Sequence, residues 1–469
     1  MKRLTLGRKL AFAACDVLGG GAFNIINFLY PVFLALTVGL SAYWISVIML
    51  VTRIWDAVND PLMGQISDAT SSRFGKRRIY MVAGAPFILI AMVFMFYPYS
   101  FSSMTARAIA VLVSYVSFTM IQTVIMVPYY SLSSEISSDY QERASANSWR
   151  LGFSIFSSII CVSVPGLIVN RYEGGKGYII MGLIFGTIFA VCVLITGLFA
   201  KEEIKTPPAK EKFSLKPFYR LLKLSAFRQF LTMFVMLQIT MVIMSGLFFF
   251  YIDFYICRDA TAAGQANLLG MIAAAGMFSV QIVALPFYLW LIKKIGKTAA
   301  YRFGAVIWIL SGFVLFLLKP GAPDWQIIVL GIVMGFGISG PGLVPHTMLG
   351  DVGDAVQLVF GERFDGAMGG FVNFLSKVSQ AVGISLTMAV LGYYGFTQAE
   401  PGQAVLLQPE AAQNAIRVFM SFAPLVFMGL GSLISYKYKI SASKQKEIRH
   451  AIESNNRPSL LLKELVDNA

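Results

Sequence analysis

The chain has 469 residues, of which 57% are hydrophobic and only 13% are charged, and its mean hydropathy is +0.69. This composition lies well outside the range of soluble globular proteins and indicates an integral membrane protein. The net charge of +14 does not point to nucleic acid, because lysines and arginines gather in alternate loops, as the positive-inside rule predicts for cytoplasmic loops.

Twelve apolar windows are long enough to cross a membrane as helices, which takes about 20 residues each. In chain order they cover residues 10–36, 41–66, 79–99, 105–132, 148–170, 177–199, 228–254, 264–292, 300–318, 325–349, 367–394 and 411–436. The first two windows nearly touch and the end near 350 is weakly marked, so eleven spans remain an alternative. Long apolar runs argue against an outer-membrane barrel, and no cleavage site follows the first run. We therefore expect an all-α membrane protein.

The basic residues gather at the N-terminus, after the second and eighth windows, in the central stretch and after the last window. Both termini should therefore face the cytoplasm, which requires an even number of spans and favours twelve. We expect an N-terminal six-helix half (1–199), a charged cytoplasmic linker (200–227), a C-terminal six-helix half (228–436) and a cytoplasmic tail (437–469). The tail is expected to form a short amphipathic helix near anionic lipid.

A short repeat supports two pseudo-symmetric halves. "RFGKRRIY" (73–80) follows the second window, and "KIGKTAAY" (294–301) follows the eighth. This plan resembles the major facilitator superfamily. Such folds hold substrate and coupling-ion sites near the midplane between the halves and work by rocking one half against the other.

The second window carries ionisable residues inside an apolar run, "RIWDAVNDPLMG". On a helix, Arg53, Asp56 and Asp60 share one face, and Asn59 neighbours it. Carboxylate and amide oxygens suit small cations, and a carboxylate pair in a low dielectric also takes up a proton. The alternative is that Arg53 neutralises one aspartate as a fixed ion pair. Ionisable residues inside a membrane favour the functional interpretation.

Three stretches carry a closer resemblance: "RIWDAVNDPLMGQISDATSSRFGKRR", "VPYYSLSSEISSDYQERASANSWR" and "GDVGDAVQLVFGERFDGAMGGFVNFLSKVSQAVG". They resemble the glycoside-pentoside-hexuronide:cation symporters, the melibiose-carrier branch of the major facilitator superfamily. The resemblance implies a cation site made of Asp56, Asn59, Asp60 and Thr123. It also implies coupling to Na+ or Li+, with H+ as the alternative.

The resemblance further implies a substrate site made of Asp16, Gly20, Asn24, Met126, Tyr130, Arg150 and Lys377. Gly20 and Met126 stand where melibiose carriers have carboxylates that grip the sugar, so galactoside recognition of that type is not expected. Arg150 and Lys377 would suit an anionic sugar such as a hexuronide. Two alternatives remain open: the glycines of the first window pack helices closely, and Lys377 forms a salt bridge to the paired aspartates.

Gating residues are implied by the same resemblance. Asp68, Arg73 and Lys76 match the loop motif that ties helix ends together in the outward-facing state. Arg143, in the loop after the fourth window, and Arg363, after the tenth, are expected to act likewise, although "GER" replaces the family's "GKR" at Arg363. The alternative is a set of solvated charged loops.

No phosphate-binding glycine loop, Ser/His/Asp order or metal-ligand spacing is visible, and the four cysteines form no CxxC pair. We therefore predict no enzyme and no cofactor, but a monomeric symporter of the bacterial inner membrane that moves a small-molecule sugar by alternating access. An animal lysophospholipid symporter resembles the same stretches and is the alternative substrate class. Asp16 and the lack of that protein's long glycosylated loops favour a sugar. A sensor or a scramblase would not need the cation ligands.

Overall fold

The computed structural model describes residues 4–137, 139–172, 175–202, 216–257, 263–361, 364–398 and 408–454. Within these ranges every regular element is helical and no strand occurs. The predicted all-α fold is confirmed.

The predicted first half forms the helices α1 (Leu6–Ala14), α2 (Asp16–Asn24), η1 (Ile25–Leu29), α3 (Tyr30–Leu36), α4 (Ala42–Ala69), α5 (Arg78–Met95), α6 (Met104–Glu135), α7 (Tyr140–Val169) and α8 (Lys176–Phe199). The first four make up one span, Leu6–Leu36, interrupted by the π-helical turn η1. Here the N–H of Tyr30 donates to the carbonyl of Ile25, five residues earlier. Pro31, which follows, has no N–H, so the regular hydrogen-bond pattern is broken at this point.

The rest of the chain forms α9 (Lys216–Leu222), α10 (Ser225–Tyr251), η2 (Ile252–Ile256), α11 (Ala263–Val283), α12 (Leu285–Ile295), α13 (Lys297–Leu317), α14 (Asp324–Phe360), α15 (Asp365–Tyr393), α16 (Glu410–Ala423), η3 (Pro424–Met428), α17 (Gly429–Tyr436) and α18 (Ala442–Glu453). The predicted end of the tenth window at 349 is wrong. α14 continues to Phe360, about three turns further. Asp351 and Asp354 therefore lie on this helix.

Ten helices in the described ranges are long and apolar enough to cross a membrane. A pair bent by 45°, Leu268–Val283 and Leu285–Ile295, makes eleven if it is one span. The remaining predicted window is α4. With 28 residues it is long enough, but Arg53, Asp56 and Asp60 make it too polar to qualify by composition. The chain is thus a multi-pass membrane protein in which the most polar predicted span carries the candidate cation ligands.

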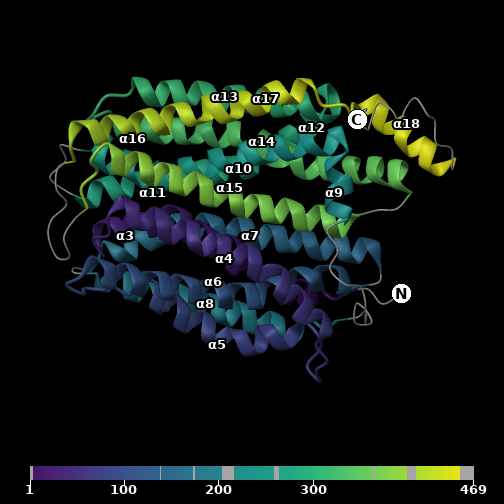
Figure 1. The fold of residues 1–469 in the computed structure, drawn as a ribbon, viewed down its shortest axis with the longest axis horizontal. Helices are drawn as coiled ribbons and strands as arrows, with labels where there is room; N and C mark the ends of the chain where they lie inside the picture. Colours follow the sequence, from purple (N-terminus) through teal and green to yellow (C-terminus); the bar gives the residue numbers. More distant parts are fainter. Residues whose placement is uncertain are drawn as a thin grey trace. The chain divides into compact units, whose positions relative to one another are not determined.

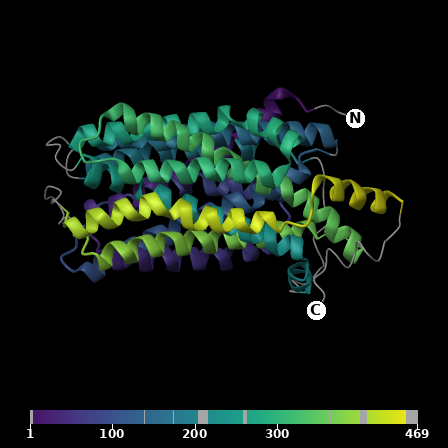
Figure 2. The same cartoon turned by 90° about the horizontal axis from the view of Figure 1, so that it is seen from above.

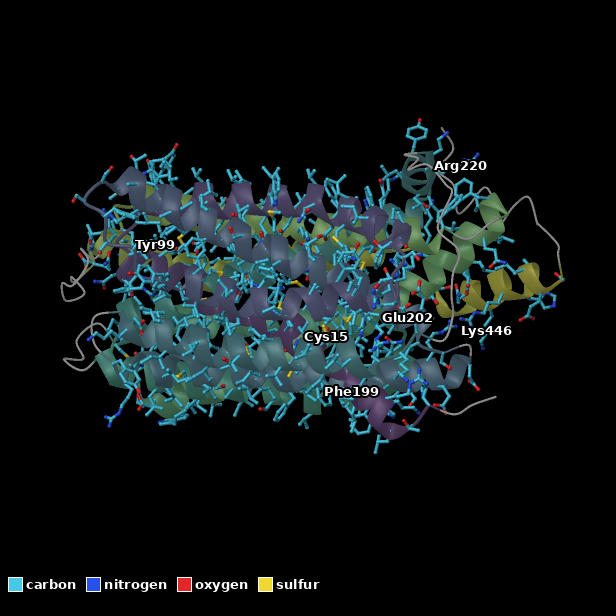
Figure 3. All side chains as sticks on the ribbon, turned by 90° about the horizontal axis from the view of Figure 1, so that it is seen from below. Cys15, Tyr99, Phe199, Glu202, Arg220 and Lys446 are labelled. Carbon is cyan, nitrogen blue, oxygen red and sulfur yellow. The ribbon has the colours of Figure 1, made fainter. Side chains whose placement is uncertain are left out.

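Packing divides the chain into two compact units. Unit 1 contains Met1–Glu211, Ser245–Ala275 and Ile384–Ile416, and unit 2 contains Lys212–Met244, Gly276–Gly383 and Arg417–Ala469. Within unit 1, Ser46 and Ser385 each donate from the hydroxyl to the other's carbonyl at 3.3 Å, which joins α4 to the last turns of α15. Figure 3 places Tyr99 and Glu202 toward opposite ends of unit 1. The boundaries of the two predicted halves remain a prediction.

Small residues let neighbouring helices approach closely in unit 1. A Cβ atom added at Gly182 of α8 would lie 3.2 Å from the carbonyl of Met92, and one at Gly197 would lie 3.0 Å from the backbone nitrogen of Val82. Both contacts are with α5, and Figure 1 shows α5, α6 and α8 side by side. Membrane helices depend on such close packing because lipid is as apolar as their own side chains.

In unit 2, glycines likewise let α13 and α14 approach each other closely. A Cβ atom at Gly304 would lie 2.6 Å from the carbonyl of Gly337, and one at Gly337 would lie 2.8 Å from the backbone nitrogen of Trp308. Trp308 itself is fully buried. The two helices are therefore held at a separation that larger side chains would not allow.

The predicted tail helix is present as α18, drawn in yellow in Figures 1 and 2. It packs on α14 and buries Ile448 and Ala451. On its polar side, Gln445 Nε2 donates to Asp354 Oδ2 at 2.7 Å, and Arg449 Nε lies 3.2 Å from the same oxygen. α18 is thus docked on protein, whereas its contact with anionic lipid remains a prediction.

Candidate functional site

The predicted cation ligands lie on α4 and α6 in unit 1. Thr123 Oγ1 donates a hydrogen bond to Asp60 Oδ1 at 3.0 Å, so the structure brings two of the four predicted residues into contact. Asp56, one helical turn earlier, is buried with 4% of its surface exposed. The Nδ2 atom of Asn59 has no hydrogen-bond partner among the described residues. Carboxylate, amide and hydroxyl oxygens form a donor set that suits a small hard cation.

Pro61 adds a further oxygen to this part of α4. It lies inside the helix and has no N–H to offer the carbonyl of Ala57, four residues earlier. That carbonyl oxygen lies on the same helical turn as Asp60 and accepts no hydrogen bond from residue 61.

Arg53 partly compensates the negative charge of Asp56. Its Nη1 lies 3.7 Å from Asp56 Oδ2, and the two side chains are only 9% and 6% exposed. This separation is an ion pair but is longer than a hydrogen bond. Arg53 therefore forms with Asp56 the fixed ion pair that the sequence left open as an alternative. Asp60 instead accepts a hydrogen bond from the hydroxyl of Thr123.

Four of the predicted substrate residues come together beside this site in unit 1. Arg150 Nε of α7 lies 3.9 Å from Asp16 Oδ2 of α2, and the guanidinium carbon lies 5.6 Å from the centroid of the Tyr130 ring. A Cβ atom at Gly19 would lie 2.5 Å from Asp16 Oδ1 and 2.8 Å from the Cε atom of Met126. The cluster combines a carboxylate, a guanidinium held over an aromatic ring, and an apolar thioether.

The other predicted substrate residues have different surroundings. A Cβ atom at Gly20 would lie 2.5 Å from the carbonyl of Ser154, so this glycine packs α2 against α7. Asn24 Nδ2 donates to the carbonyl of Gly20 at 2.9 Å, within its own helix. These contacts fit the helix-packing alternative. Lys377 is half-buried on α15 and belongs to unit 2, so its relation to the cluster remains a prediction.

Sequence reasoning missed Arg77, which lies at the centre of a charge cluster at the end of α4. The residue is 5% exposed. It donates from Nη1 to Ser67 Oγ at 2.6 Å, and from Nη2 to Asp68 Oδ1 at 2.5 Å and Glu135 Oε1 at 3.1 Å. Glu135 is also 5% exposed. The guanidinium thus ties the start of α5 to the ends of α4 and α6.

Two of the predicted gating residues join this cluster and one does not. Lys76 Nζ lies 3.5 Å from Asp68 Oδ1. Arg73 is exposed and forms no ion pair with the described part of the chain. Between them stands Gly75 with a φ of +108°, a conformation that favours glycine. The chain turns at Gly75, and the basic residues that follow it are the ones that reach α4.

Glu202 caps the start of α5. Its carboxylate accepts hydrogen bonds from the backbone N–H groups of Lys76 at 3.0 Å, Arg77 at 2.7 Å and Arg78 at 3.2 Å. An anion is stabilised there because helix N-termini present unpaired N–H groups and a partial positive charge. A Cβ atom at Gly75 would lie 2.7 Å from Glu202 Oε1. The positive φ therefore favours glycine at this position, and a side chain there would also press on the Glu202 carboxylate.

Arg143 lies in the first turn of α7 and not in a loop, so that part of the prediction is wrong. Its neighbour Glu142 pairs with Lys9 Nζ at 2.8 Å and accepts a hydrogen bond from the N–H of Leu4 at 3.2 Å. The hydrogen bond from Lys9 lowers the pKa of Glu142 below its usual value. This helix end thus holds the N-terminal segment in place. Arg363 lies outside the described residues.

Unit 2 contains a counterpart to the Arg77 cluster. Lys297 Nζ donates to Asp351 Oδ2 at 2.5 Å and to the carbonyl of Thr347 at 2.8 Å. Gly296, just before it, has a φ of +88°. The sequence repeat contained the signal for Lys297, but ending the tenth window at 349 placed its acidic partner Asp351 in a loop and not on α14.

Comparisons with known proteins identify related membrane transporters. Residues 11–442 match the family described as MFS/sugar transport protein. The putative glycoside/cation symporter YagG of Escherichia coli (strain K12) is 25% identical and covers 96% of this chain and 95% of its own. The isoprimeverose transporter of Lactiplantibacillus pentosus is 24% identical over 95% and 92%. Sodium-dependent lysophosphatidylcholine symporter 1 of Gallus gallus is 23% identical over 96% and 90%.

A solved structure of the nucleoside transporter NupG aligns with a TM-score of 0.60 and 15% identity, covering 92% of this chain and 99% of that one. At this identity the likeness shows the fold alone. These proteins are membrane transporters and not enzymes, and the predicted kinship with glycoside-pentoside-hexuronide:cation symporters is confirmed. The chain belongs to the MFS/sugar transport protein family.

Proposed function

We propose that this protein is a symporter that couples the movement of a glycoside, pentoside or hexuronide to a cation by alternating access. The family match and the names of the bacterial relatives support a sugar as the substrate. We further propose that it works as a monomer among the lipids of a bacterial inner membrane, with both termini in the cytoplasm, as the basic loops indicate.

The observation that carries the coupling is the contact between Thr123 and Asp60, 3.0 Å apart on two helices, with Asp56 buried one turn away. An aspartate inside a membrane span is costly unless it is compensated. The hydroxyl of Thr123 contacts Asp60, so Asp60 is the carboxylate to which we assign the travelling cation. The oxygen donors favour Na+ or Li+, and H+ is the alternative.

The substrate is assigned to the cluster of Asp16, Tyr130 and Arg150. A carboxylate accepts hydrogen bonds from sugar hydroxyls, a guanidinium donates to hydroxyls or to a uronate, and the exposed Tyr130 ring offers a face for stacking. A lysophospholipid is the second candidate. Met126 favours it, because this buried apolar side chain lies where a sugar-gripping carboxylate would stand in melibiose carriers.

The test is uptake into proteoliposomes driven by an inward Na+ gradient. Labelled glucuronides, pentosides and lysophosphatidylcholine would be compared for the wild type and for Asp60→Asn. Asp324→Asn, an exposed aspartate at the start of α14, is the matched control. We expect sugar uptake that Asp60→Asn abolishes and Asp324→Asn leaves unchanged. Uptake of lysophosphatidylcholine alone would refute the sugar assignment, and uptake that Asp60→Asn leaves intact would refute the cation site.

A further inference from the structure

Asp253 is an acid inside a membrane span and lies outside the candidate site. It belongs to η2, the π-helical turn that follows α10, in which the N–H of Cys257 donates to the carbonyl of Ile252 at 2.9 Å. The span Ser225–Ile256 is apolar by composition. Single π-helical turns within longer helices are frequent at functional sites, and an ionisable side chain inside a membrane span is expected to have a function.

Asp253 has no cation to compensate it within the described part of the chain. It forms no ion pair there, and its Oδ1 atom is buried without a hydrogen-bond partner. The side chains of Ile252, Phe254 and Ile256, which belong to the same turn, are at most 6% exposed. The carboxyl group therefore lies in apolar surroundings without an opposite charge.

Aromatic contacts pack this end of the helix within unit 1. Phe28 of η1 meets Phe248 and Phe249 of α10 edge-on, with centroid separations of 5.9 Å and 6.2 Å. Phe254 of η2 meets Phe396, which follows α15, with centroids 5.5 Å apart. All five residues belong to unit 1. The last turns of α10 and η2 are thus packed against the first span and against the segment after α15.

The ionisable groups that face Asp253 from the described elements are tyrosines. Tyr178 of α8 is close enough to interact electrostatically with the carboxyl group, and Tyr255 lies two residues further along η2. A phenol is neutral at physiological pH. On the first span, the carbonyl of Val38 accepts a hydrogen bond from Arg107 Nη1 at 2.8 Å, so this guanidinium has a partner of its own. The carboxyl group is therefore the one that can change its charge near neutral pH.

These surroundings favour a proton over a metal ion as the ligand. A small hard cation needs several oxygen ligands, and Asp60 has the hydroxyl of Thr123 beside it. No such contact to Asp253 is found in the described ranges. An unpaired carboxylate taken out of water is so unfavourable that the group takes up a proton instead. Asp253 as a whole is only partly buried, as exchange of a proton requires.

We propose that Asp253 binds a proton and that this proton keeps η2 packed within unit 1. Ionisation would place an uncompensated charge among aromatic side chains, so loss of the proton weakens this packing. The packed arrangement is therefore favoured at low pH and is lost as the pH rises.

The side of the membrane from which the proton comes rests on the proposed function. α10 begins just after the proposed cytoplasmic linker and crosses the membrane once, so η2 lies at the opposite surface. The pH outside the cytoplasm would then control how readily unit 1 opens at this end. The proton site itself does not depend on the substrate.

The first test is infrared absorption of the purified protein at neutral pH, where an ordinary aspartate is ionised. The wild type should show the C=O stretching band of a protonated carboxyl group, and Asp253→Asn should lose it. Asp324→Asn, which replaces an exposed aspartate, should keep the band, and so should Asp253→Glu, which keeps a carboxyl group. A band of equal strength in Asp253→Asn would overturn the proposal, as would an Asp253 band that disappears when Na+ is added.

The second test follows the opening of this end of unit 1. Ser385→Cys replaces a serine whose hydroxyl donates to the carbonyl of Ser46, and its labelling by a membrane-impermeant maleimide would be compared with that of the protein without this cysteine. Ionisation of the thiol affects all backgrounds equally. For each unit by which the pH rises, labelling should accelerate up to about tenfold more with Asp253 than with Asp253→Asn.

Equal pH responses of the Asp253 and Asp253→Asn backgrounds would overturn the proposal. Asp253→Glu should restore the pH response, and its failure to do so in a protein that shows the carboxyl band would also count against the proposed packing role. Absence of sugar uptake by the wild type would refute the proposed function and leave the infrared result standing, so the two failures are distinguishable.

Discussion

Replacing Arg77 with methionine is expected to destabilise unit 1 strongly. Arg77 and Glu135 are each 5% exposed and are joined at 3.1 Å. Removing one member of a buried ion pair costs about 3–5 kcal/mol. The contact with Asp68 adds only about 0–1 kcal/mol, because that side chain is 38% exposed. The free energy of unfolding should therefore fall by about 3–5 kcal/mol.

The measurement is equilibrium unfolding of the purified protein in mixed detergent micelles, with Arg73→Met as the matched control. Arg73 is exposed and should change the free energy of unfolding by no more than about 0.5 kcal/mol. Combining Arg77→Met with Glu135→Gln removes both charges and should recover part of the loss. Equal losses for the two arginine variants, or no recovery in the double variant, would refute this account of the cluster.

Thr123→Val removes the hydroxyl bonded to Asp60, and a hydrogen bond to a charged group is worth about 1.5–3 kcal/mol. The Na+ concentration for half-maximal uptake should rise about 10- to 100-fold, and unchanged Na+ dependence would contradict the cation site. The pKa of Glu142 is lowered in the folded protein. Its ion pair with Lys9 therefore contributes fully to stability at pH values above the usual glutamate pKa of about 4.3. This contribution is lost as pH falls through the lower folded-state pKa, so hydrogen exchange of the N-terminal segment should accelerate there and not near neutrality. Ile448→Asp should release α18 from α14, because it places a carboxylate in a fully buried position; proteolysis at residues 437–441 should then accelerate, and an unchanged rate would argue against docking.

The helices could be predicted from sequence where hydrophobicity alone decides them. The windows 177–199 and 300–318 correspond to α8 and α13 within three residues at each end, because apolar length is what a membrane selects. The predicted end of the tenth window, at residue 349, is wrong, because α14 continues to Phe360. Its last three turns carry Asp351 and Asp354, which look like a loop by composition but are satisfied by Lys297 and α18. Tertiary partners here extend a helix beyond its apolar part.

Spacing predicts the candidate site only where its residues are close in sequence, whereas Thr123 and the residues around Asp16 are expected from the family resemblance. Arg53, Asp56 and Asp60 share a helical face by spacing alone. The choice between Arg73 and Arg77 depends on the turn at Gly75, which fixes which guanidinium reaches Glu135. A run of four basic residues does not encode that choice without the backbone conformation.

The two units differ in chemistry although a short repeat relates them. Each has a glycine of positive φ followed by a basic residue that pairs with an acid on a later helix: Gly75 and Arg77 in unit 1, and Gly296 and Lys297 in unit 2. The repeat itself aligns Gly75 and Lys76 with Gly296 and Lys297, and each of these lysines lies close to an aspartate. The candidate cation ligands, by contrast, lie on α4 and α6 of unit 1, whereas in unit 2 α10 and α15 are joined by a hydrogen bond between Gln238 and Ser376.

A carboxylate inside a membrane span binds a cation well but carries a desolvation cost whenever the cation leaves. Under the proposed function, the occupancy of the site at Asp60 would therefore depend on the cation gradient. Variants of Thr123 should change the Na+ dependence of uptake, and a Thr123 variant that shifted only the sugar dependence would contradict this assignment.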